Sequence, residues 1–129
     1  MNTQKKLLLL STFVTYPGFD TVFKNYQYQV TKVKTLRKAL SFIKQIKPDV
    51  IVAEFIYAPT YGSQLSNFES LFAAAQAYAP DANFIALVHK DDLTHLEQVS
   101  ANIKNCQILT LPAQTSALTT CLDTLSTVE

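Results

Sequence analysis

The clearest pattern in this chain lies in residues 35–52, which read TLRKALSFIKQIKPDVIV. Apolar side chains recur at the spacing of one helix face, which is typical of an amphipathic helix, at Leu36, Ala39, Leu40, Ile43 and Ile46. Thr35 can cap this helix through its side-chain oxygen. Pro48 ends it, because the residue before a proline is driven out of the helical conformation. Val50–Val52 then form a continuous aliphatic run, which indicates a strand buried on both faces.

The same alternation extends along the chain in both directions. Continuous apolar runs predict strands at 7–10 and 84–88, and weaker alternating runs predict strands at 28–33 and 107–111. Helical patterns lie between them at 19–25, 65–79 and 93–103. Asp91 or Asp92 can cap the helix at 93–103, and Thr115 or Ser116 can cap a last helix that turns Leu118, Leu122 and Leu125 inward.

This order predicts an α/β fold with five βα units. We expect a (βα)5 doubly wound, five-stranded parallel sheet with right-handed crossovers and helices on both faces. This is the flavodoxin-like arrangement, with strand order 2-1-3-4-5, and it places any site in the crevice at the carboxyl ends of the strands. The loops after the first, third, fourth and fifth strands are therefore where functional residues are expected.

Length and composition limit the class of protein. The 129 residues, 48% hydrophobic and 16% charged, predict a single globular domain over 1–129. The longest aliphatic run, Leu7–Leu10, is too short to span a bilayer or to act as a secretion signal, so no membrane role is expected. Two glycines exclude a Walker A loop or a GxGxxG turn. Cys106 and Cys121 are too few for a disulfide scaffold, and we expect unreactive, buried or half-buried thiols in a cytoplasmic protein.

Charge is divided unevenly between the two parts of the chain. Residues 1–48 carry nine Lys and Arg side chains against one acid, whereas residues 49–129 carry two against nine. We do not expect a nucleic-acid surface, since the basic part contains a single Arg and its lysines are not interleaved with aromatic residues. A solvated helix face accounts for this distribution most simply. A dipolar protein that steers a partner, or that stacks head to tail on itself, is the alternative.

Three segments together resemble the receiver domain of response regulators. Residues 48–54, PDVIVAE, followed by Pro59 and Gly62, resemble its third strand. Residues 85–92, IALVHKDD, resemble its fourth strand and the entry to the next helix. Residues 108–112, ILTLP, resemble its fifth strand, which in receivers ends in a cis-proline loop. The resemblance covers nearly the whole chain and implies bacterial two-component signalling, in which receivers act in phosphorelays.

The resemblance also implies where the phosphorylation site would lie. Receivers phosphorylate an Asp at the end of the third strand, hold Mg²⁺ with two acids after the first, and use a Thr or Ser and a Lys after the fourth and fifth. These positions are occupied here by Glu54, by Ser11 and Thr12, by Val88 and by Leu111, and the aromatic switch position by Ile108. Only the carboxylate is kept. Magnesium prefers one or two carboxylates with phosphate and water, so we expect a degenerate site without metal, cofactor or catalysis.

Glu54 has two interpretations at this stage. It can be a half-exposed carboxylate that is hydrogen-bonded to Ser11, Thr12 or a loop N–H and has no signalling role. It can also be a permanent mimic of the phosphorylated state, although Val88 has no hydroxyl to follow a phosphate and Ile108 is not a rotating aromatic.

The remaining candidate sites are weaker. His89, Asp92 and His95 have the spacing of a metal cluster, and Ser11, His89 and Asp92 that of a triad, but convergent ligands and a nucleophile elbow are missing. Aromatic residues after the third strand, at Phe55, Tyr57 and Tyr61, cover the crevice or admit a planar ligand. The helix at 65–79 is apolar nearly all round, so Phe68, Phe72 and Tyr78 form a possible interface unless residues 57–65 cover it.

These observations predict a non-enzymatic, phosphorylation-independent receiver-like domain. Its function would be to bind a protein partner or a second copy of itself in a two-component or transcriptional regulator. The alternative is a small-ligand sensor that uses the former phosphorylation crevice.

Overall fold

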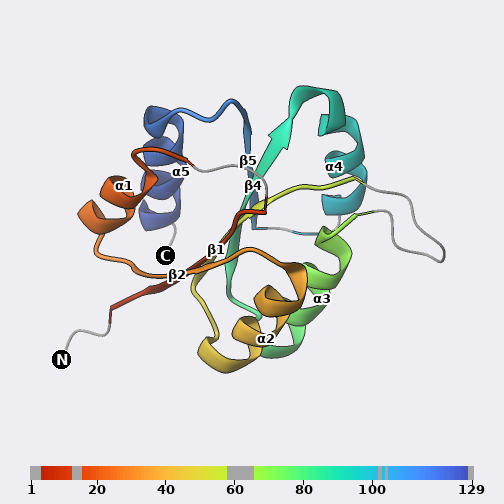
Figure 1. Ribbon diagram of the computed structural model, residues 1–129, viewed down its shortest axis with the longest axis horizontal. Helices are drawn as coiled ribbons and strands as arrows, with labels where there is room; N and C mark the ends of the chain where they lie inside the picture. Colours follow the sequence, from red (N-terminus) through yellow and green to blue (C-terminus); the bar gives the residue numbers. More distant parts are fainter. Residues whose placement is uncertain (1–3, 13–15, 58–65, 102, 104, 128–129) are drawn as a thin grey trace.

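The computed structural model describes residues 4–12, 16–57, 66–101, 103 and 105–127. Five parallel strands form one sheet in the order β2-β1-β3-β4-β5, with helices on both faces (Figure 1). The fold class, the strand order and the alternation of elements are as predicted. The strands are β1 (Lys6–Leu10), β2 (Gln29–Val33), β3 (Val50–Glu54), β4 (Asn83–His89) and β5 (Cys106–Leu111). The helices are α1 (Phe19–Asn25), α2 (Leu36–Ile46), α3 (Phe68–Tyr78), the 3₁₀ turn η1 (Lys90–Asp92), α4 (Leu93–Ser100) and α5 (Thr115–Thr127).

The central strands are aliphatic because both of their faces are covered. All residues of β3 are buried, as are Leu7–Leu10 of β1 and Phe84–Val88 of β4. The edge strands β2 and β5 are only partly buried, which explains their weaker, alternating sequence pattern. Lys32 is an exposed residue of the edge strand β2 and forms an ion pair with Asp20 of α1 at 2.8 Å.

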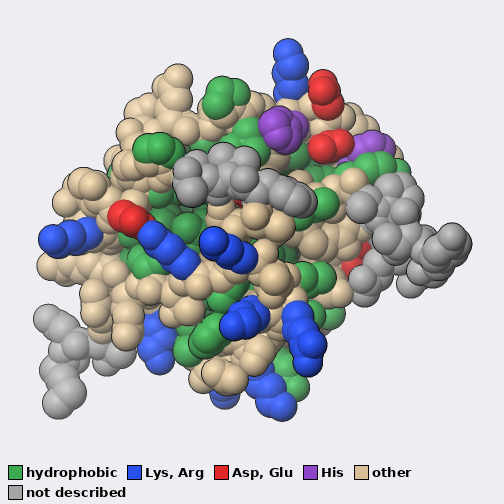
Figure 2. All heavy atoms as spheres, viewed as in Figure 1, with side chains coloured by type: hydrophobic (Ala, Val, Ile, Leu, Met, Phe, Trp, Pro, Cys, Tyr) green, Lys and Arg blue, Asp and Glu red, His purple; other side chains and the backbone are tan. Residues whose placement is uncertain are grey.

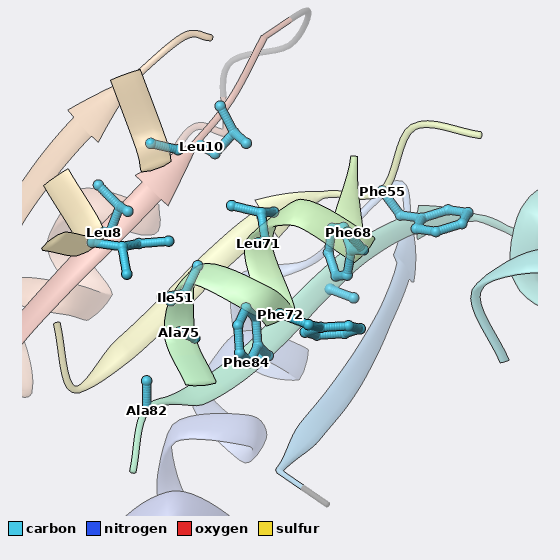
Figure 3. Packing of buried hydrophobic residues seen from close by; sticks show 14 of the residues in the cluster. Leu8, Leu10, Ile51, Phe55, Phe68, Leu71, Phe72, Ala75, Ala82 and Phe84 are labelled. Atoms are coloured by element: carbon cyan, nitrogen blue, oxygen red, sulfur yellow. The ribbon is translucent and has the colours of Figure 1, made fainter. Parts of the chain in front are cut away.

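Two hydrophobic clusters lie on opposite faces of the sheet. The larger one fills the space between the sheet and α2, α3 and α4, and the other lies under α1 and α5. Figure 3 shows the larger cluster, in which Phe68 and Phe72 of α3 lie beside Phe84 of β4. The Phe72 and Phe84 rings meet edge to face, with centroids 4.7 Å apart. The helix predicted after residue 115 turns Leu118, Leu122 and Leu125 into the second cluster, as expected.

The ends of α2 form as the sequence predicts. Thr35 Oγ1 accepts a hydrogen bond from Lys38 N at 3.2 Å, so Thr35 is the N-cap. Lys47 adopts the left-handed conformation, with φ 50°, immediately before Pro48. The chain therefore turns sharply from the helix into β3.

Two helix boundaries differ from the prediction. The helix expected at 65–79 begins at Phe68, and Asn67 at its N-cap position makes no side-chain capping hydrogen bond. One residue earlier, Ser66 Oγ accepts from Phe68 N at 3.1 Å and Glu69 Oε1 accepts from Ser66 N at 3.0 Å. This reciprocal arrangement resembles a capping box placed one residue before the N-cap. The helix expected at 93–103 ends at Ser100 and is preceded by the turn η1. Asp92 occupies its N-cap position, but its side chain makes no capping hydrogen bond.

Candidate functional site

The carboxyl ends of the strands bring most of the predicted site residues to one edge of the sheet. Glu54 is the last residue of β3, while Ser11 and Thr12 directly follow β1. Because β1 and β3 are neighbouring parallel strands, with Leu10 paired to Ala53, these residues meet at the same level. The structure therefore brings Ser11, Thr12 and Glu54 together.

Glu54 is the centre of this edge and is buried, with 5% of its surface exposed. The expectation of a half-exposed carboxylate is therefore wrong, whereas the expected contacts with Ser11 and Thr12 are present. Oε1 accepts a hydrogen bond from Thr12 N at 2.8 Å. Oε2 accepts one from Tyr16 Oη at 2.6 Å and a longer one from Ser11 Oγ at 3.4 Å. Both carboxylate oxygens are thus engaged by groups of the loop after β1, which explains how this polar side chain is buried.

Tyr16 is a residue of this edge that was not predicted from the sequence. Its ring stacks on Phe19 of α1, with centroids 5.0 Å apart and an interplanar angle of 18°, so the hydroxyl is held over Glu54. Burial raises the pKa of the Tyr16 hydroxyl, and the hydrogen bond to Glu54 and its charge raise it further. Tyr16 therefore stays a donor. The only hint in the sequence is its place in the loop after the first strand, next to Pro17 and Gly18.

The remaining predicted positions of the site carry apolar side chains. Val88 is fully buried in the cluster under α2, α3 and α4. Leu111 is half-buried and lines a small cavity next to Glu54. Ile108 is 38% exposed on the edge strand β5, and its aliphatic side chain occupies the position of the receiver's aromatic switch residue.

The small cavity beside Glu54 has a volume of about 180 Å³. The described residues that line it include no Lys or Arg. They are Glu54, Phe55, Ile56, Tyr57, Leu87, His89, Asp92 and Leu111. His95 does not join His89 and Asp92 here. Its ring stacks on Tyr57, with centroids 3.6 Å apart and the planes within 3°. Tyr61 lies outside the described residues, as do Pro59 and Gly62.

The donor groups at this edge decide whether a metal ion can be held there. Over the described ranges of the chain no three His, Cys, Asp or Glu side chains are grouped so that they could hold a metal ion. At the predicted site, Glu54 supplies the carboxylate and Ser11 only a hydroxyl, and both Glu54 oxygens accept protein hydrogen bonds. These residues do not fit Mg²⁺, which requires oxygen ligands in near-octahedral geometry.

Asn67 anchors the chain beyond Glu54 and was also missed. Its Nδ2 donates to Glu54 O at 2.7 Å, and its Oδ1 accepts from Ile56 N at 2.8 Å. Phe55 N donates to Leu87 O at 2.8 Å. The backbone on the carboxyl side of Glu54 is therefore held in place from both α3 and β4.

The possible interface on α3 is reduced to one of its three residues. Phe68 and Phe72 belong to the core, with 0% and 8% of their surfaces exposed, so they are not available to a partner. Their rings fill the space over β4, which is why the helix is apolar beyond one narrow stripe. Tyr78 is 41% exposed, and Lys44 Nζ of α2 lies 5.6 Å from the centre of its ring.

Neither thiol has the features of a reactive cysteine. Cys106 is half-buried and Cys121 buried. Burial raises the pKa of Cys106 to about 11 and also raises that of Cys121. Both groups are therefore thiols rather than thiolates at neutral pH. This agrees with the expectation of unreactive residues.

Comparison with solved structures shows the fold. The chain is similar to the chemotaxis protein CheY4 of Vibrio cholerae, with 18% identity, a TM-score of 0.71 and coverage of 98% of this chain and 100% of that one. It is similar to a response regulator receiver protein of Sinorhizobium medicae, with 17% identity, a TM-score of 0.71 and coverage of 97% and 96%. A structure described as adenylate cyclase from Rhodopirellula baltica has 21% identity, a TM-score of 0.68 and coverage of 95% and 87%.

The chain therefore has the flavodoxin-like fold of receiver domains. No family model matches the sequence. No curated protein matches it either. Within the part of the chain that the structure describes, no helix has the length and apolar character needed to cross a membrane.

Proposed function

We propose that this chain is an atypical receiver-like signalling domain that works without phosphorylation and acts by binding a protein partner or a second copy of itself. Its setting would be a cytoplasmic two-component or transcriptional regulator. The observation that carries the proposal is the hydrogen bonding of Glu54. Tyr16 and Thr12 donate to its two oxygens at 2.6 and 2.8 Å.

Phosphoryl transfer requires charge that this site does not offer. The developing phosphate is stabilised by a metal ion and by a cationic side chain. The position of the receiver's Lys is occupied by Leu111, and the positions of its two metal-binding acids by Ser11 and Thr12. In addition, Tyr16 and Thr12 donate to the two Glu54 oxygens, one of which would have to attack a phosphate donor.

The contacts of Glu54 favour one fixed state over a switch. A receiver switch needs a second arrangement in which a hydroxyl and an aromatic side chain follow the phosphate. Val88 has no hydroxyl, and Ile108 is not aromatic. The contacts with Tyr16 and Thr12 instead join β3 to the loop after β1 without any ligand. We infer that the domain offers one binding surface permanently, and that its control comes from the availability of its partner.

A small-ligand role for the crevice is less well supported. The cavity next to Glu54 is about 180 Å³, whereas pockets for small molecules have volumes of about 300–1,000 Å³. The Tyr57–His95 stack also joins the loop after β3 to α4 beside this cavity. A larger hollow of about 450 Å³ lies at the same edge of the sheet, lined by Ser11, Thr12 and Tyr16 among others. The small-ligand role therefore remains the second candidate, and the interaction role remains the proposed function.

The test of phosphorylation independence is incubation with acetyl phosphate and Mg²⁺, followed by intact-mass measurement. We expect no acyl-phosphate adduct on the native chain, and no fluorine signal of bound beryllofluoride in a parallel NMR experiment. A variant with Ser11→Asp, Thr12→Asp, Glu54→Asp, Val88→Thr and Leu111→Lys restores every position of the receiver site and serves as the positive control. An adduct on Glu54 of the native chain would overturn the proposal.

A further inference from the structure

The basic and acidic parts of the sequence lie on different sides of the folded molecule. With strand order β2-β1-β3-β4-β5, the first two βα units lie together at one side of the sheet and the later units at the other. Figure 2 shows most Lys and Arg side chains over the lower part of the view, where α2 lies in Figure 1. Acidic and His side chains gather at the upper right, where α4 lies.

The basic side of this division is the outer surface of α2. Arg37, Lys38 and Lys44 are exposed there, and the helix contains no acidic residue. Exposed Lys34 and Lys47 lie just before and after the helix. The exposed ring of Tyr78 lies beside Lys44. We call Arg37, Lys38, Lys44 and Tyr78 the basic face.

The acidic side is formed by η1 and α4. Asp91 and Glu97 are exposed and Asp92 is half-exposed, and within these two elements Lys90 is the only basic residue besides His95. Ile108 lies on β5, the strand that pairs with β4 just before η1. We call Asp91, Asp92, Glu97 and Ile108 the acidic face.

The alternation of side chains along β5 shows that Ile108 belongs on this side of the sheet. Leu109 and Leu111 join the cluster under α1 and α5, whereas Cys106 joins the cluster under α2, α3 and α4. Successive residues of a strand point to opposite faces, so Ile108 shares the face that carries α4. Its exposure of 38% shows that α4 does not cover it.

The two faces are complementary in charge and alike in having one apolar anchor. Among the residues that the structure describes, Tyr78 and Ile108 are the exposed large hydrophobic side chains, and each face contains one. Interfaces are typically stabilised by a few aromatic or aliphatic anchors surrounded by polar groups. Opposite charge around two such anchors favours their approach and fixes its direction.

The two faces also lie far enough apart to be used at once. The helices α2, α3 and α4 cover the same face of the sheet, with α2 over the β2 side and α4 over the β4 side. In Figure 1, α3 lies between the other two. A second molecule can therefore meet the basic face while a third meets the acidic face.

We propose that this domain associates head to tail with further copies of itself, the basic face of one molecule binding the acidic face of the next. This inference rests on the proposed interaction role and names the partner. A symmetric dimer formed through one of these faces alone would place like charges against each other, which is unfavourable. The contact is heterologous, so it leaves one free face at each end and extends into short chains.

Sedimentation velocity over a range of protein concentrations tests this arrangement. At about 0.01 M salt, where the screening length is about 30 Å, we expect the sedimentation coefficient to rise with concentration. At about 1 M salt, where that length is about 3 Å, we expect the monomer value throughout. A native chain that remains monomeric at low salt, or associates equally at high salt, overturns the proposal.

Charge-reversal variants test the pairing of the two faces. Arg37→Glu with Lys38→Glu, and separately Asp91→Lys with Glu97→Lys, should each abolish association. A chain that carries all four substitutions should regain it, because complementarity is restored with the signs exchanged. Tyr78→Ser and Ile108→Ser should each weaken association at unchanged charge. Loss with the α2 variant alone would mean that the basic face pairs with another surface of this chain, and it would overturn the pairing with the acidic face.

Lys24→Glu is the matched control for these variants. Lys24 is an exposed basic residue of α1, on the opposite face of the sheet, and its reversal should leave association unchanged. Circular dichroism of each variant checks that the fold is kept. None of the substituted residues contacts Glu54 through a described hydrogen bond, so failure of self-association leaves the phosphorylation test unaffected.

Discussion

At the scale of single residues, the burial of Glu54 depends on its donors. A polar group removed from water is costly unless its hydrogen-bonding capacity is satisfied, and here the loop after β1 satisfies it. A receiver's acidic pair in the same loop would repel this carboxylate. Ser11 and Thr12 instead provide a hydroxyl and a backbone N–H group as donors.

The first prediction concerns the hydroxyl of Tyr16. Tyr16→Phe leaves Glu54 Oε2 without its shortest hydrogen bond, so we expect a loss of about 1–3 kcal/mol in the free energy of unfolding. Urea denaturation measures it. Tyr26→Phe is the control, since Tyr26 donates to Asp123 at the surface, and it should cost less than about 1 kcal/mol. Equal effects of the two substitutions would contradict a special role for Tyr16.

The raised pKa of Tyr16 predicts a dependence of stability on pH. The folded state holds the proton above the ordinary tyrosine pKa of about 10, whereas the unfolded state releases it. The unfolded chain then binds fewer protons, so this contribution to stability is complete below about pH 10 and decreases above it. Denaturation curves between about pH 8 and 11 should show a steeper decline for the native chain than for Tyr16→Phe.

A third prediction concerns Cys106. With a pKa of about 11, only about one in ten thousand of its side chains is a thiolate at pH 7. We expect very slow alkylation by iodoacetamide in the folded protein, an increase as the pH approaches 11, and fast reaction in denaturant. Rapid modification of folded Cys106 at pH 7 would show that its thiol is not protected by burial.

The residue scale is also where the sequence was least informative. Tyr16, Ser66 and Asn67 lie in loops, and a loop residue acquires its partner from the tertiary fold rather than from a periodic pattern. Phe68 and Phe72 were misplaced for a related reason. Periodicity shows that a helix is apolar on several sides, but it does not show how large a surface the sheet and its neighbours cover.

At the scale of elements, the helices and strands could be predicted because the burial of an element determines its pattern of apolar residues. The two covered faces of β1, β3 and β4 require continuous aliphatic runs, and the single covered side of α2 requires a helical repeat. Strand order follows from chain order and right-handed crossovers. The start of α3 and the end of α4 were misplaced, since local capping and the last turn of a helix are not set by periodicity. Asp92 makes no capping hydrogen bond, although its residue type favours one.

Gly18 links two elements and carries the fourth prediction. It precedes α1 with φ 88°, and a Cβ atom there would lie 2.7 Å from Thr115 Cγ2 at the start of α5. Gly18→Ala should destabilise the protein by about 1–3 kcal/mol through the left-handed backbone and this clash. Adding Thr115→Ser removes the methyl group and should recover part of the loss. Full recovery would show that the backbone conformation costs nothing.

At the scale of the whole molecule, the near-neutral net charge conceals a dipole. The formal net charge is +1 at pH 7, yet α2 is basic and the surface of η1 and α4 is acidic. An association of exposed charges is weak for each pair, at about 0–1 kcal/mol. The charges therefore contribute more by orienting two approaching molecules than by stabilising the contact, because the electric field of the molecule acts before contact.

The dipole predicts the behaviour of the monomer on charged matrices. At low salt and a pH near the isoelectric value of 7.7, dilute protein should be retained on both cation and anion exchangers. Arg37→Glu with Lys38→Glu should reduce retention on the cation exchanger only. A native chain that passes through both matrices would show that its charges do not act as separate faces.

The lysine on the outermost strand has a consequence for how copies of this molecule can join. Any strand that added itself alongside β2 would have to strip water from the ammonium group of Lys32, whose side chain is 57% exposed. A lysine on an edge strand opposes the growth of a continuous sheet from one molecule to another. Fibrils of the amyloid kind are thereby disfavoured, and any polymer built through helices would dissolve again when salt is added.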